Sequence, residues 1–511
     1  MLSSTGSPAC AGAHLIPIMH KQWNDAAAAA CATELALRAY SSRLIGSDPA
    51  LVLYGGGNTS VKLTGETGAG RQGAVLYVKG SGADLGQVHE EDFTPLSLSP
   101  LLALLEQEEL NAPDLARAVA PYVLRQGAPK PSIETLMHAA LPWRYVEHTH
   151  ATPVLALCNT PDGEAHVRAA FDGQVVLVPY RHSGFDLARA CVRSYAEQYR
   201  EGMRGMVLMH HGACAWGADA KSSYEAMLGL AAGAQAYLRA HHAWELDKTA
   251  QGPMPVDLAR ARVIAGLRRD ASLAAGRPLI ATLRDDAVMR AFAQRDDLER
   301  ITVQGPATPG HTIFTKRFPL LGRDVVGFAA RYREHLGEVR NIDAAPRVIL
   351  DADLGMLGLG VNKFYADAAA AVYASDAKVI ARAEKLQAYA TIEAALMLKA
   401  EIEYAGFEAK VAQREPRAGR VALVADAFAQ RGRINELLAA GWAIAALDAD
   451  PLVATLFTSP NYRGLRADAD DAADRARVLD AVVRAFGGID FHLAPSPWDA
   501  LFNPLLEYAI P

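Results

Sequence analysis

Residues 131–150 read PSIETLMHAALPWRYVEHTH. Ser132 stands before an apolar-periodic run that a proline ends, so the first half predicts a short helix with Ser132 as its N-cap. The second half alternates as a strand, and His148 and His150 lie two positions apart on one face of it. Two imidazoles on one face can hold a single ion, so the stretch predicts a helix–strand unit with two candidate metal ligands.

A third imidazole is available downstream, in HHGACAWG at 210–217. The apolar residues 206–210 predict a strand, which places His210 or His211 at a strand end beside a glycine turn. Three imidazoles with an open fourth position are typical of a catalytic zinc, where the metal acts as a Lewis acid on a bound oxygen. Spacing alone leaves the alternative open, namely packed histidines and an incidental turn.

Two glycine-rich turns are candidate anion sites. GGGNTS at 55–60 and KGSG at 79–82 each follow a predicted strand and offer backbone N–H groups beside short hydroxyl and amide side chains. Ser132, at a helix N-terminus, would add a third donor. Neither turn matches the P-loop or the dinucleotide motif, and glycine runs also serve tight hairpins, so a phosphate role depends on the three features occurring together.

Glu134 falls in the first turn of the helix that is predicted to open at Ser132. A carboxylate there can simply be a partner of the helix dipole. If it faces the metal, it becomes a candidate general acid/base or a displaceable ligand. His138, four residues later on the same face, is either a rival ligand or a buried, hydrogen-bonded histidine.

Outside this region the pattern predicts an α/β fold with short strands between helices. Residues 20–47 predict one helix, and 49–64 predict a strand, a glycine turn and a second strand. Residues 347–360 predict one strand, followed by a long helical region at 364–404. Beyond 416, three strand-like segments with helices between them indicate a parallel βαβ sheet.

Composition excludes several classes of function. The 511 residues are 51% hydrophobic with a net charge of −6, so ordinary cores can form and neither nucleic acid nor a membrane is an expected partner. No segment approaches ~20 uninterrupted apolar residues, and residues 1–18 carry no Lys or Arg, so we expect a cytoplasmic protein with Met19 as a candidate start. The five cysteines are widely spaced without a CxxC pair, which fits a reducing compartment: Cys10, Cys31, Cys158, Cys191 and Cys214.

The C-terminal segment departs from a nucleotide-binding unit. Asp448 ends a predicted strand, where a dinucleotide fold places an acid for the ribose hydroxyls. The preceding turn contains a single glycine, Gly432, so a pyrophosphate would meet the side chains of Asp426 and Gln430. We expect a folded βαβ scaffold that binds no nucleotide, and NAD is not an expected cofactor.

Together these residues resemble the class II aldolase/adducin family. The resemblance covers residues 20–345 and rests on GGGNTSVK at 55–62, VKGSG at 78–82, PSIETLMHAALP at 131–142, EHTH at 147–150 and HHGACAWG at 210–217. The flanking sequence, from QGPATPGHTIFTK at 304–316 to GRVALV at 419–424, is similar to the bifunctional rhamnulose-1-phosphate aldolase/alcohol dehydrogenase subgroup. In that subgroup a short-chain dehydrogenase domain follows the aldolase.

The resemblance implies roles for individual positions around the metal. His148, His150 and His211 match the metal-binding histidines of the family. His211 is favoured over His210 because it directly precedes the glycine. Glu134 matches the catalytic carboxylate.

The resemblance also implies a phosphate site. Asn58, Ser81, Gly82 and Ser132 match positions that bind the substrate phosphate, although the family's shorter aldolases have a second serine where Ile133 stands. The family contributes further groups, among them a second acid/base, from a neighbouring subunit, which implies a homo-oligomer.

The resemblance divides the chain into a disordered leader at 1–19, a class II aldolase-like α/β domain with a central sheet at 20–345, a strand and helical linker at 346–415, and a smaller, truncated, degenerate Rossmann-like domain at 416–511. It implies a metal-dependent lyase, with zinc as the expected metal, that cleaves a ketose 1-phosphate such as rhamnulose 1-phosphate to dihydroxyacetone phosphate and an aldehyde. The alternatives are a sugar-phosphate epimerase or dehydratase and a non-catalytic adducin-like scaffold. Since no Ser and Tyr-xxx-Lys set follows residue 416, we expect that segment to be structural.

Overall fold

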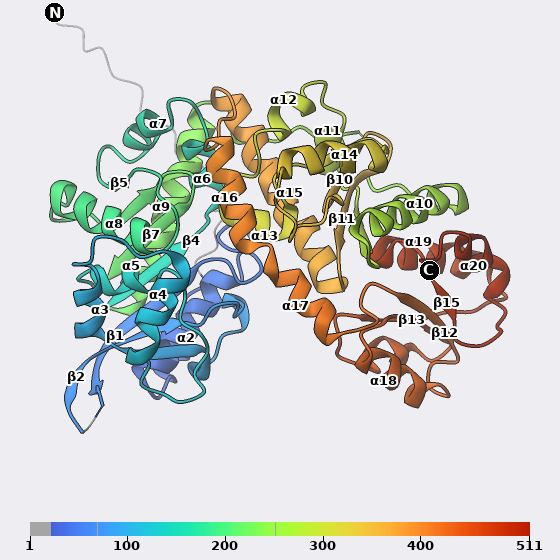
Figure 1. Cartoon of the computed structure of the whole chain (residues 1–511), viewed down its shortest axis with the longest axis horizontal. Helices are drawn as coiled ribbons and strands as arrows, with labels where there is room; N and C mark the ends of the chain where they lie inside the picture. Colours follow the sequence, from blue (N-terminus) through green and yellow to red (C-terminus); the bar gives the residue numbers. More distant parts are fainter. Residues whose placement is uncertain (1–21, 69, 251, 511) are drawn as a thin grey trace, which may run out of the picture.

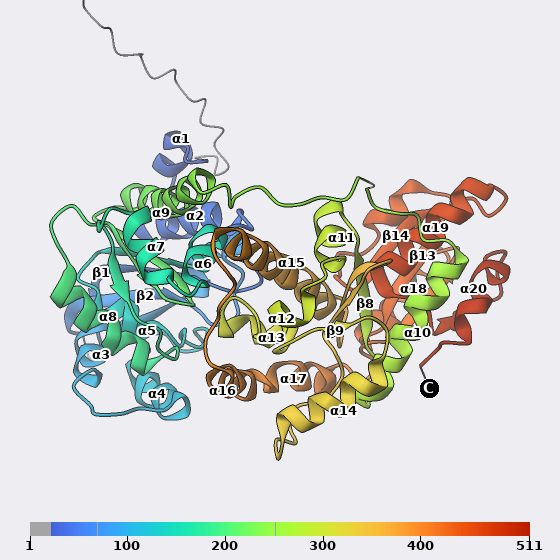
Figure 2. The ribbon, with the colours of Figure 1, turned by 90° about the horizontal axis from the view of Figure 1, so that it is seen from above.

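The computed structural model describes residues 22–68, 70–250 and 252–510. The expected leader, Met19 and Cys10 lie outside these ranges. Within them, secondary structure forms three units in a row: the N-terminal unit (22–246), the central unit (258–414) and the C-terminal unit (419–510) (Figures 1 and 2). None of the helices described there combines the length and the apolar character needed to cross a bilayer.

The N-terminal unit is built on a seven-stranded, mostly antiparallel sheet of order β3-β2-β1-β4-β7-β6-β5. Its strands are β1 (Asn58–Glu66), β2 (Gln72–Lys79), β3 (Phe93–Ser97), β4 (Tyr145–Thr149), β5 (Val176–Val178), β6 (Gly205–Leu208) and β7 (Gly212–Gly217). Asn58 pairs with His148 across β1 and β4, and His148 pairs with Cys214 across β4 and β7. This register places the end of the first glycine-rich turn beside the candidate metal ligands.

Helices cover both faces of this sheet. They are α1 (Asp25–Ala29), α2 (Glu34–Gly46), α3 (Leu98–Leu104), α4 (Ala112–Val119), α5 (Thr135–Ala140), α6 (Thr152–Cys158), α7 (Gly163–Ala170), α8 (Phe185–Gln198) and α9 (Ala220–Ala240). The single helix predicted over 20–47 is wrong, because Thr33 adopts an extended backbone and caps α2 through Ala36 N–H. The first strand predicted within 49–64 is also absent from the described residues, since Tyr54 turns the chain with φ +46.

Helix α5 begins later than the sequence predicts. Its N-cap residue is Glu134, and the hydroxyl of Ser132 instead accepts a hydrogen bond from the Glu134 N–H at 3.2 Å. Ser132 therefore shapes the turn that leads into the helix, and the Glu134 side chain is left at the helix start.

The central unit contains a four-stranded sheet of order β8-β11-β10-β9. Its strands are β8 (Ile280–Arg284), β9 (Leu320–Leu321), β10 (Val348–Asp351) and β11 (Gly355–Gly360). The single strand predicted over 347–360 is wrong, because Gly355 has φ +92 and the segment folds into the β10–β11 hairpin. The domain boundary that we expected at 345 falls inside this sheet, since β11 pairs with β8.

The helices of the central unit connect it to both neighbours. They are α10 (Leu258–Ala275), α11 (Ala287–Ala293), α12 (Leu298–Thr302), α13 (Thr312–Thr315), α14 (Val325–Leu336), α15 (Lys363–Leu386), α16 (Ala394–Tyr404) and α17 (Gly406–Arg414). The helical region predicted over 364–404 is thus two helices, α15 and α16. In both views α15 runs from the N-terminal unit to the central sheet (Figures 1 and 2).

The C-terminal unit has a four-stranded parallel sheet of order β14-β13-β12-β15, which confirms the predicted partial Rossmann-like βαβ fold. Its elements are β12 (Val421–Ala425), α18 (Arg431–Ala439), β13 (Ala443–Asp448), β14 (Tyr462–Arg466), α19 (Ala472–Phe486), β15 (Phe491–His492) and α20 (Asp499–Leu506).

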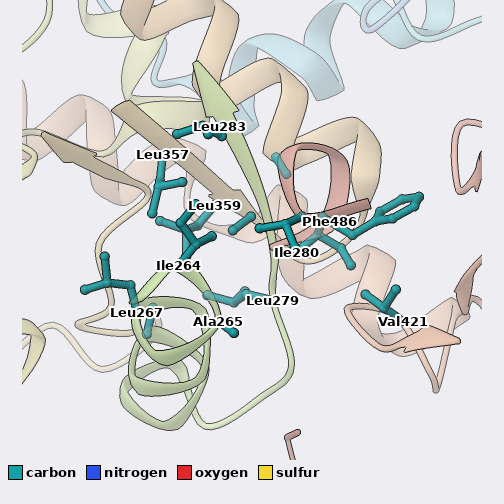
Figure 3. Packing of buried hydrophobic residues seen from close by; sticks show 14 of the residues in the cluster. Ile264, Ala265, Leu267, Leu279, Ile280, Leu283, Leu357, Leu359, Val421 and Phe486 are labelled. Atoms are coloured by element: carbon teal, nitrogen blue, oxygen red, sulfur yellow. The ribbon is translucent and has the colours of Figure 1, made fainter. Parts of the chain in front are cut away.

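The central and C-terminal units share one hydrophobic core. Ile264 and Leu267 of α10, Ile280 of β8, Val421 of β12 and Phe486 of α19 belong to a single buried cluster (Figure 3). A buried ion pair of Arg268 and Asp490, 2.6 Å long, crosses the same contact.

Candidate metal centre and active site

Three histidine side chains meet at the end of β4. His148 lies on β4, His150 follows it, and His211 precedes β7. The ring centroids are 4.9 Å apart for His148 and His211, 5.2 Å for His148 and His150, and 5.3 Å for His150 and His211. One ring nitrogen of each lies within 4.8 Å of the other two, so the three can hold one ion.

The turn between β6 and β7 brings His211, and not His210, to this group. His210 has φ +56, and its Nδ1 lies 3.1 Å from Asn159 Oδ1. Gly212 has φ +152, and a Cβ atom there would lie 2.1 Å from the carbonyl oxygen of Thr149. Only glycine allows the turn to approach β4 so closely, and this approach carries His211 to the other two imidazoles.

The tautomer of His148 fits a metal ligand. Its Nδ1–H donates to the carbonyl of Ala213 at 3.1 Å, so Nε2 carries a lone pair. Nε2 is buried without a hydrogen-bond partner among the described residues, and it faces Glu134 Oε2 at 3.4 Å. Two lone pairs face each other unfavourably unless a proton or a cation lies between them. The donor set therefore fits a divalent cation.

The protonation states also suit a cation. Burial lowers the pKa of His148 to about 4, and burial together with the neighbouring histidines lowers that of His150 well below its usual range. Burial raises the pKa of Glu134, but the charges of His148 and His211 and hydrogen bonds from His211 and Asn58 outweigh it, so this pKa lies well below its ordinary value. Near neutral pH His148 and His150 are therefore neutral and Glu134 is ionised, the states in which these groups bind a metal.

A chain of directed hydrogen bonds holds Glu134. Asn58 Nδ2 donates to Glu134 Oε2 at 2.7 Å and to Ser132 Oγ at 3.1 Å. Asn58 Oδ1 must then accept, and it accepts from His138 Nε2. His138 Nδ1 in turn accepts from Ser60 Oγ at 2.7 Å. His138 is therefore a buried, hydrogen-bonded histidine, the second of the two interpretations that its position allowed.

The two glycine-rich turns lie on one side of a cleft of about 440 Å³. Lys79 joins them, because its Nζ donates to the carbonyls of Gly55 at 2.9 Å and of Ala83 at 2.6 Å. Burial lowers the pKa of Lys79 to about 8. Sequence reasoning did not single out Lys79 as a site residue. The cleft is also lined by every residue predicted to contact phosphate, namely Asn58, Ser81, Gly82 and Ser132, and by Glu134, His150 and His211.

The other side of the cleft comes from the central unit. It includes His311, Phe314, Phe364, Tyr365, Glu403 and Tyr404. The ring of Tyr54, from the N-terminal unit, contacts those of Phe314 at 6.0 Å and Phe364 at 5.5 Å between centroids. None of these residues was predicted for the site, although the segment GPATPGHT at 305–312 was visible in the sequence.

At the C-terminal sheet, the turn after β12 closes on Asp448. Its Oδ2 accepts from Phe428 N–H at 3.2 Å and its Oδ1 from Asp450 N–H at 3.1 Å. Asp426, in the same turn, has φ +51. The carboxylate that a nucleotide fold would offer to a ribose thus accepts hydrogen bonds from the turn after β12 and from the turn that follows Asp448 itself.

Two family models match this chain. Residues 37–238 match the Class II Aldolase and Adducin N-terminal domain, and residues 259–411 match Aldolase class II, second domain. The N-terminal class II aldolase domain of a conserved protein from Thermoplasma acidophilum is 35% identical, covering 41% of this chain and 95% of that one, with a TM-score of 0.38. L-fuculose-1-phosphate aldolase from Thermus thermophilus is 20% identical, covering 40% of this chain and 95% of that one, with a TM-score of 0.27.

A curated relative extends the similarity beyond the N-terminal unit. The uncharacterized oxidoreductase YuxG of Bacillus subtilis (strain 168) is 27% identical in an alignment 361 residues long, which covers 65% of this chain and 52% of YuxG. The chain thus spans about half the length of this relative. Because the two class II aldolase models follow one another along the sequence and together match more than half of the 511 residues, the chain belongs to the class II aldolase/adducin family.

Proposed function

We propose that this protein is a zinc-dependent lyase that cleaves a ketose 1-phosphate, such as rhamnulose 1-phosphate, to dihydroxyacetone phosphate and an aldehyde. The observation that supports it is the grouping of His148, His150 and His211 at the cleft lined by both glycine-rich turns, where the Glu134 carboxylate lies 3.4 Å from His148 Nε2 and 3.1 Å from His211 Nε2. The neighbouring fuculose-1-phosphate aldolases carry the same reaction class in their names.

His148, His150 and His211 would hold the zinc, which when bound supplies Lewis-acid stabilisation of charge on substrate oxygens. Glu134 would carry a proton to or from the three-carbon fragment next to the breaking bond. Asn58 keeps this carboxylate aimed at the histidines through its 2.7 Å hydrogen bond. Because Glu134 is buried, its contacts form in surroundings of lower dielectric constant than water, which strengthens them.

The phosphate would lie against the glycine-rich turns. Ser81, Gly82 and Ser132 offer hydroxyl and backbone donors toward the cleft, and Lys79 fixes the distance between the turns. The amide of Asn58 already donates to Glu134 and Ser132. Asn58 would therefore both contact the phosphate and position Glu134. Holding the phosphate fixes the reacting carbons relative to Glu134.

We assign residues 416–511 a structural role, with no NAD site, because the Asp448 carboxylate accepts hydrogen bonds from the N–H groups of Phe428 and Asp450 and the C-terminal sheet packs on the central unit. The chain is proposed to act as a homo-oligomer in the cytoplasm. The small-molecule partner is a sugar phosphate.

The test compares purified protein with the double variant His148→Ala, His150→Ala by elemental analysis and by cleavage of rhamnulose 1-phosphate. About one metal per chain and cleavage lost in the double variant are expected. His210→Ala, which changes the neighbouring histidine that faces Asn159, is the matched control and should keep both.

Glu134→Gln should keep the metal but lower turnover by ~10²-fold or more. If the product were an epimerised or dehydrated sugar phosphate and not two three-carbon compounds, the protein would be an epimerase or a dehydratase and not an aldolase. Protein that copurifies with no metal would favour the scaffold.

A further inference from the structure

His311 and Asp376 form a buried pair at the edge of the cleft, outside the residues that the proposed function uses. His311 ends the 3-10 turn η4 (Pro309–His311), and Asp376 lies on α15. His311 Nδ1 lies 2.7 Å from Asp376 Oδ1, and Asp376 is fully buried. Both residues belong to the central unit, whereas the proposed metal ligands and Glu134 belong to the N-terminal unit.

The contacts of Asp376 fix the tautomer of His311. The same Oδ1 atom also accepts from Ala307 N–H at 3.1 Å, and Oδ2 is buried without a hydrogen-bond partner among the described residues. The carboxylate oxygen therefore accepts, and His311 Nδ1–H donates. His311 Nε2 is left with its lone pair on the ring edge away from Asp376.

The position of His311 places it beside the proposed metal ligands without joining them. Its ring centroid is 5.8 Å from that of His150, and the residue lines the same cleft as Glu134 and His211. It is not among the three histidines whose nitrogens can share one ion. Glu134 and His311 both line the cleft, Glu134 from the N-terminal unit and His311 from the central unit.

Cleavage of a ketose 1-phosphate moves two protons. When the C3–C4 bond breaks, its electron pair stays with C3, the C4 hydroxyl loses its proton, and its oxygen becomes the aldehyde carbonyl. C3 must then take up a proton. One carboxylate on the C3 side cannot serve both positions, so a second group is needed on the aldehyde side.

We propose that His311, oriented by Asp376, is the catalytic residue that accepts the proton of the C4 hydroxyl. This inference rests on the proposed aldolase function. Nε2 takes the C4 hydroxyl proton as C3–C4 breaks and later releases it to solvent, while Glu134 delivers to C3 a proton drawn from solvent. One proton leaves the substrate and one is returned, so the reaction balances. The second acid/base thus comes from the same chain.

The experiment separates the two proton transfers. The metal-loaded full-length protein is given rhamnulose 1-phosphate to measure cleavage, and dihydroxyacetone phosphate alone in D₂O to measure deuterium exchange at its hydroxymethyl carbon by NMR. Exchange needs the C3-side group only. The variants are His311→Gln, Asp376→Asn and Glu134→Gln, with His335→Gln as control because His335 pairs with Glu401 away from the cleft, 3.7 Å between Nε2 and Oε2.

His311→Gln is expected to lower kcat for cleavage by ~10²-fold with exchange within about threefold of wild type and metal content unchanged. Asp376→Asn should lower cleavage at least ~10-fold, because His311 is then no longer held as the Nδ1–H tautomer. Exchange should again be retained. Glu134→Gln should lose both reactions, and His335→Gln neither. Retained exchange also shows that a variant is folded.

Three results would overturn the inference: wild-type cleavage by His311→Gln, equal loss of cleavage and exchange, or loss of bound metal, which would make His311 a ligand. A wild-type protein that catalyses neither reaction would instead defeat the proposed function itself. The two failures are therefore distinguishable.

Discussion

Asn58 Nδ2 lies 2.7 Å from Glu134 Oε2, and this hydrogen bond connects the first glycine-rich turn to the buried carboxylate. Asn58→Ala should lower turnover more than it raises KM, because it releases Glu134 and leaves His138 Nε2–H without its acceptor. The unfolding free energy should fall by ~1–3 kcal/mol.

Ser81→Ala is the comparison, since Ser81 lines the cleft without a hydrogen bond to Glu134 in the described structure, and it should mainly raise KM. Steady-state kinetics and urea unfolding measure both, and an effect of Asn58→Ala on KM alone would contradict the positioning role.

Burial lowers the pKa of His138 to about 3, against an ordinary value of 6.5. Below pH 6.5 His138 binds a proton in the unfolded chain but stays neutral in the folded chain. The free energy of unfolding therefore has its full value above pH 6.5 and decreases as the pH falls toward 3. The slope is up to ~1.4 kcal/mol per pH unit. His138→Gln should flatten the fall of unfolding free energy between pH 6.5 and 4, measured by urea titration on metal-free protein. The control is His242→Gln at an exposed position, which should have the same slope of unfolding free energy against pH as the wild type. Equal slopes in all three proteins would show that His138 titrates freely.

Gly212→Ala tests the close approach of the β6–β7 turn to β4. The new Cβ would lie 2.1 Å from the Thr149 carbonyl at a backbone φ of +152, so the turn must shift and move His211. We expect a loss of more than ~2 kcal/mol in unfolding free energy together with weaker metal retention. Gly432→Ala, in α18 with open space around its Cβ position among the described residues, should be neutral or slightly stabilising. Undiminished metal binding by Gly212→Ala would mean that the turn adapts.

The glutamate of the EHTH motif has a structural partner. Arg38 NH1 and Glu147 Oε1 lie 2.7 Å apart with both side chains fully buried, and Ser223 Oγ donates to the same carboxylate at 2.8 Å. Arg38→Ala leaves an uncompensated buried charge and should cost ~3–5 kcal/mol of unfolding free energy. The exposed pair of Arg433 and Glu436 is the control, because water screens it, and Arg433→Ala should unfold near the wild-type midpoint. If Arg38→Ala unfolded at as high a midpoint as the control, the ion pair of Arg38 and Glu147 would not contribute to the stability of the sheet.

The grouping of the three histidines could be predicted because short-range geometry determines it. His148 and His150 share a strand face by the two-residue period, and His211 directly precedes a glycine whose positive φ the turn requires. Glu134 lies in the same loop–helix segment as Ser132, so its neighbourhood also follows from local sequence. The parallel sheet after residue 416 was predictable for the same reason.

Other features depend on long-range packing and were missed. His311 and Asp376 are 65 residues apart, and both are more than a hundred residues from His150; only the docking of α15 on the N-terminal unit brings them to the cleft. The β10–β11 segment reads as one apolar run, and its division into a hairpin depends on Gly355 and on pairing with β8. Strand β14 is short and half exposed, so its sequence carries little apolar signal.

The core that joins α10, β8 and α19 makes the last two units inseparable in any exchange of parts between related proteins. A chimera that replaced residues 416–510 alone would strip the apolar cover from α10 and leave the Arg268 guanidinium without the Asp490 carboxylate. The exchange would also have to keep the contact with the N-terminal unit, because Ala307 and Val379 of the central unit lie in the same buried cluster as Val154 and Leu155 of α6.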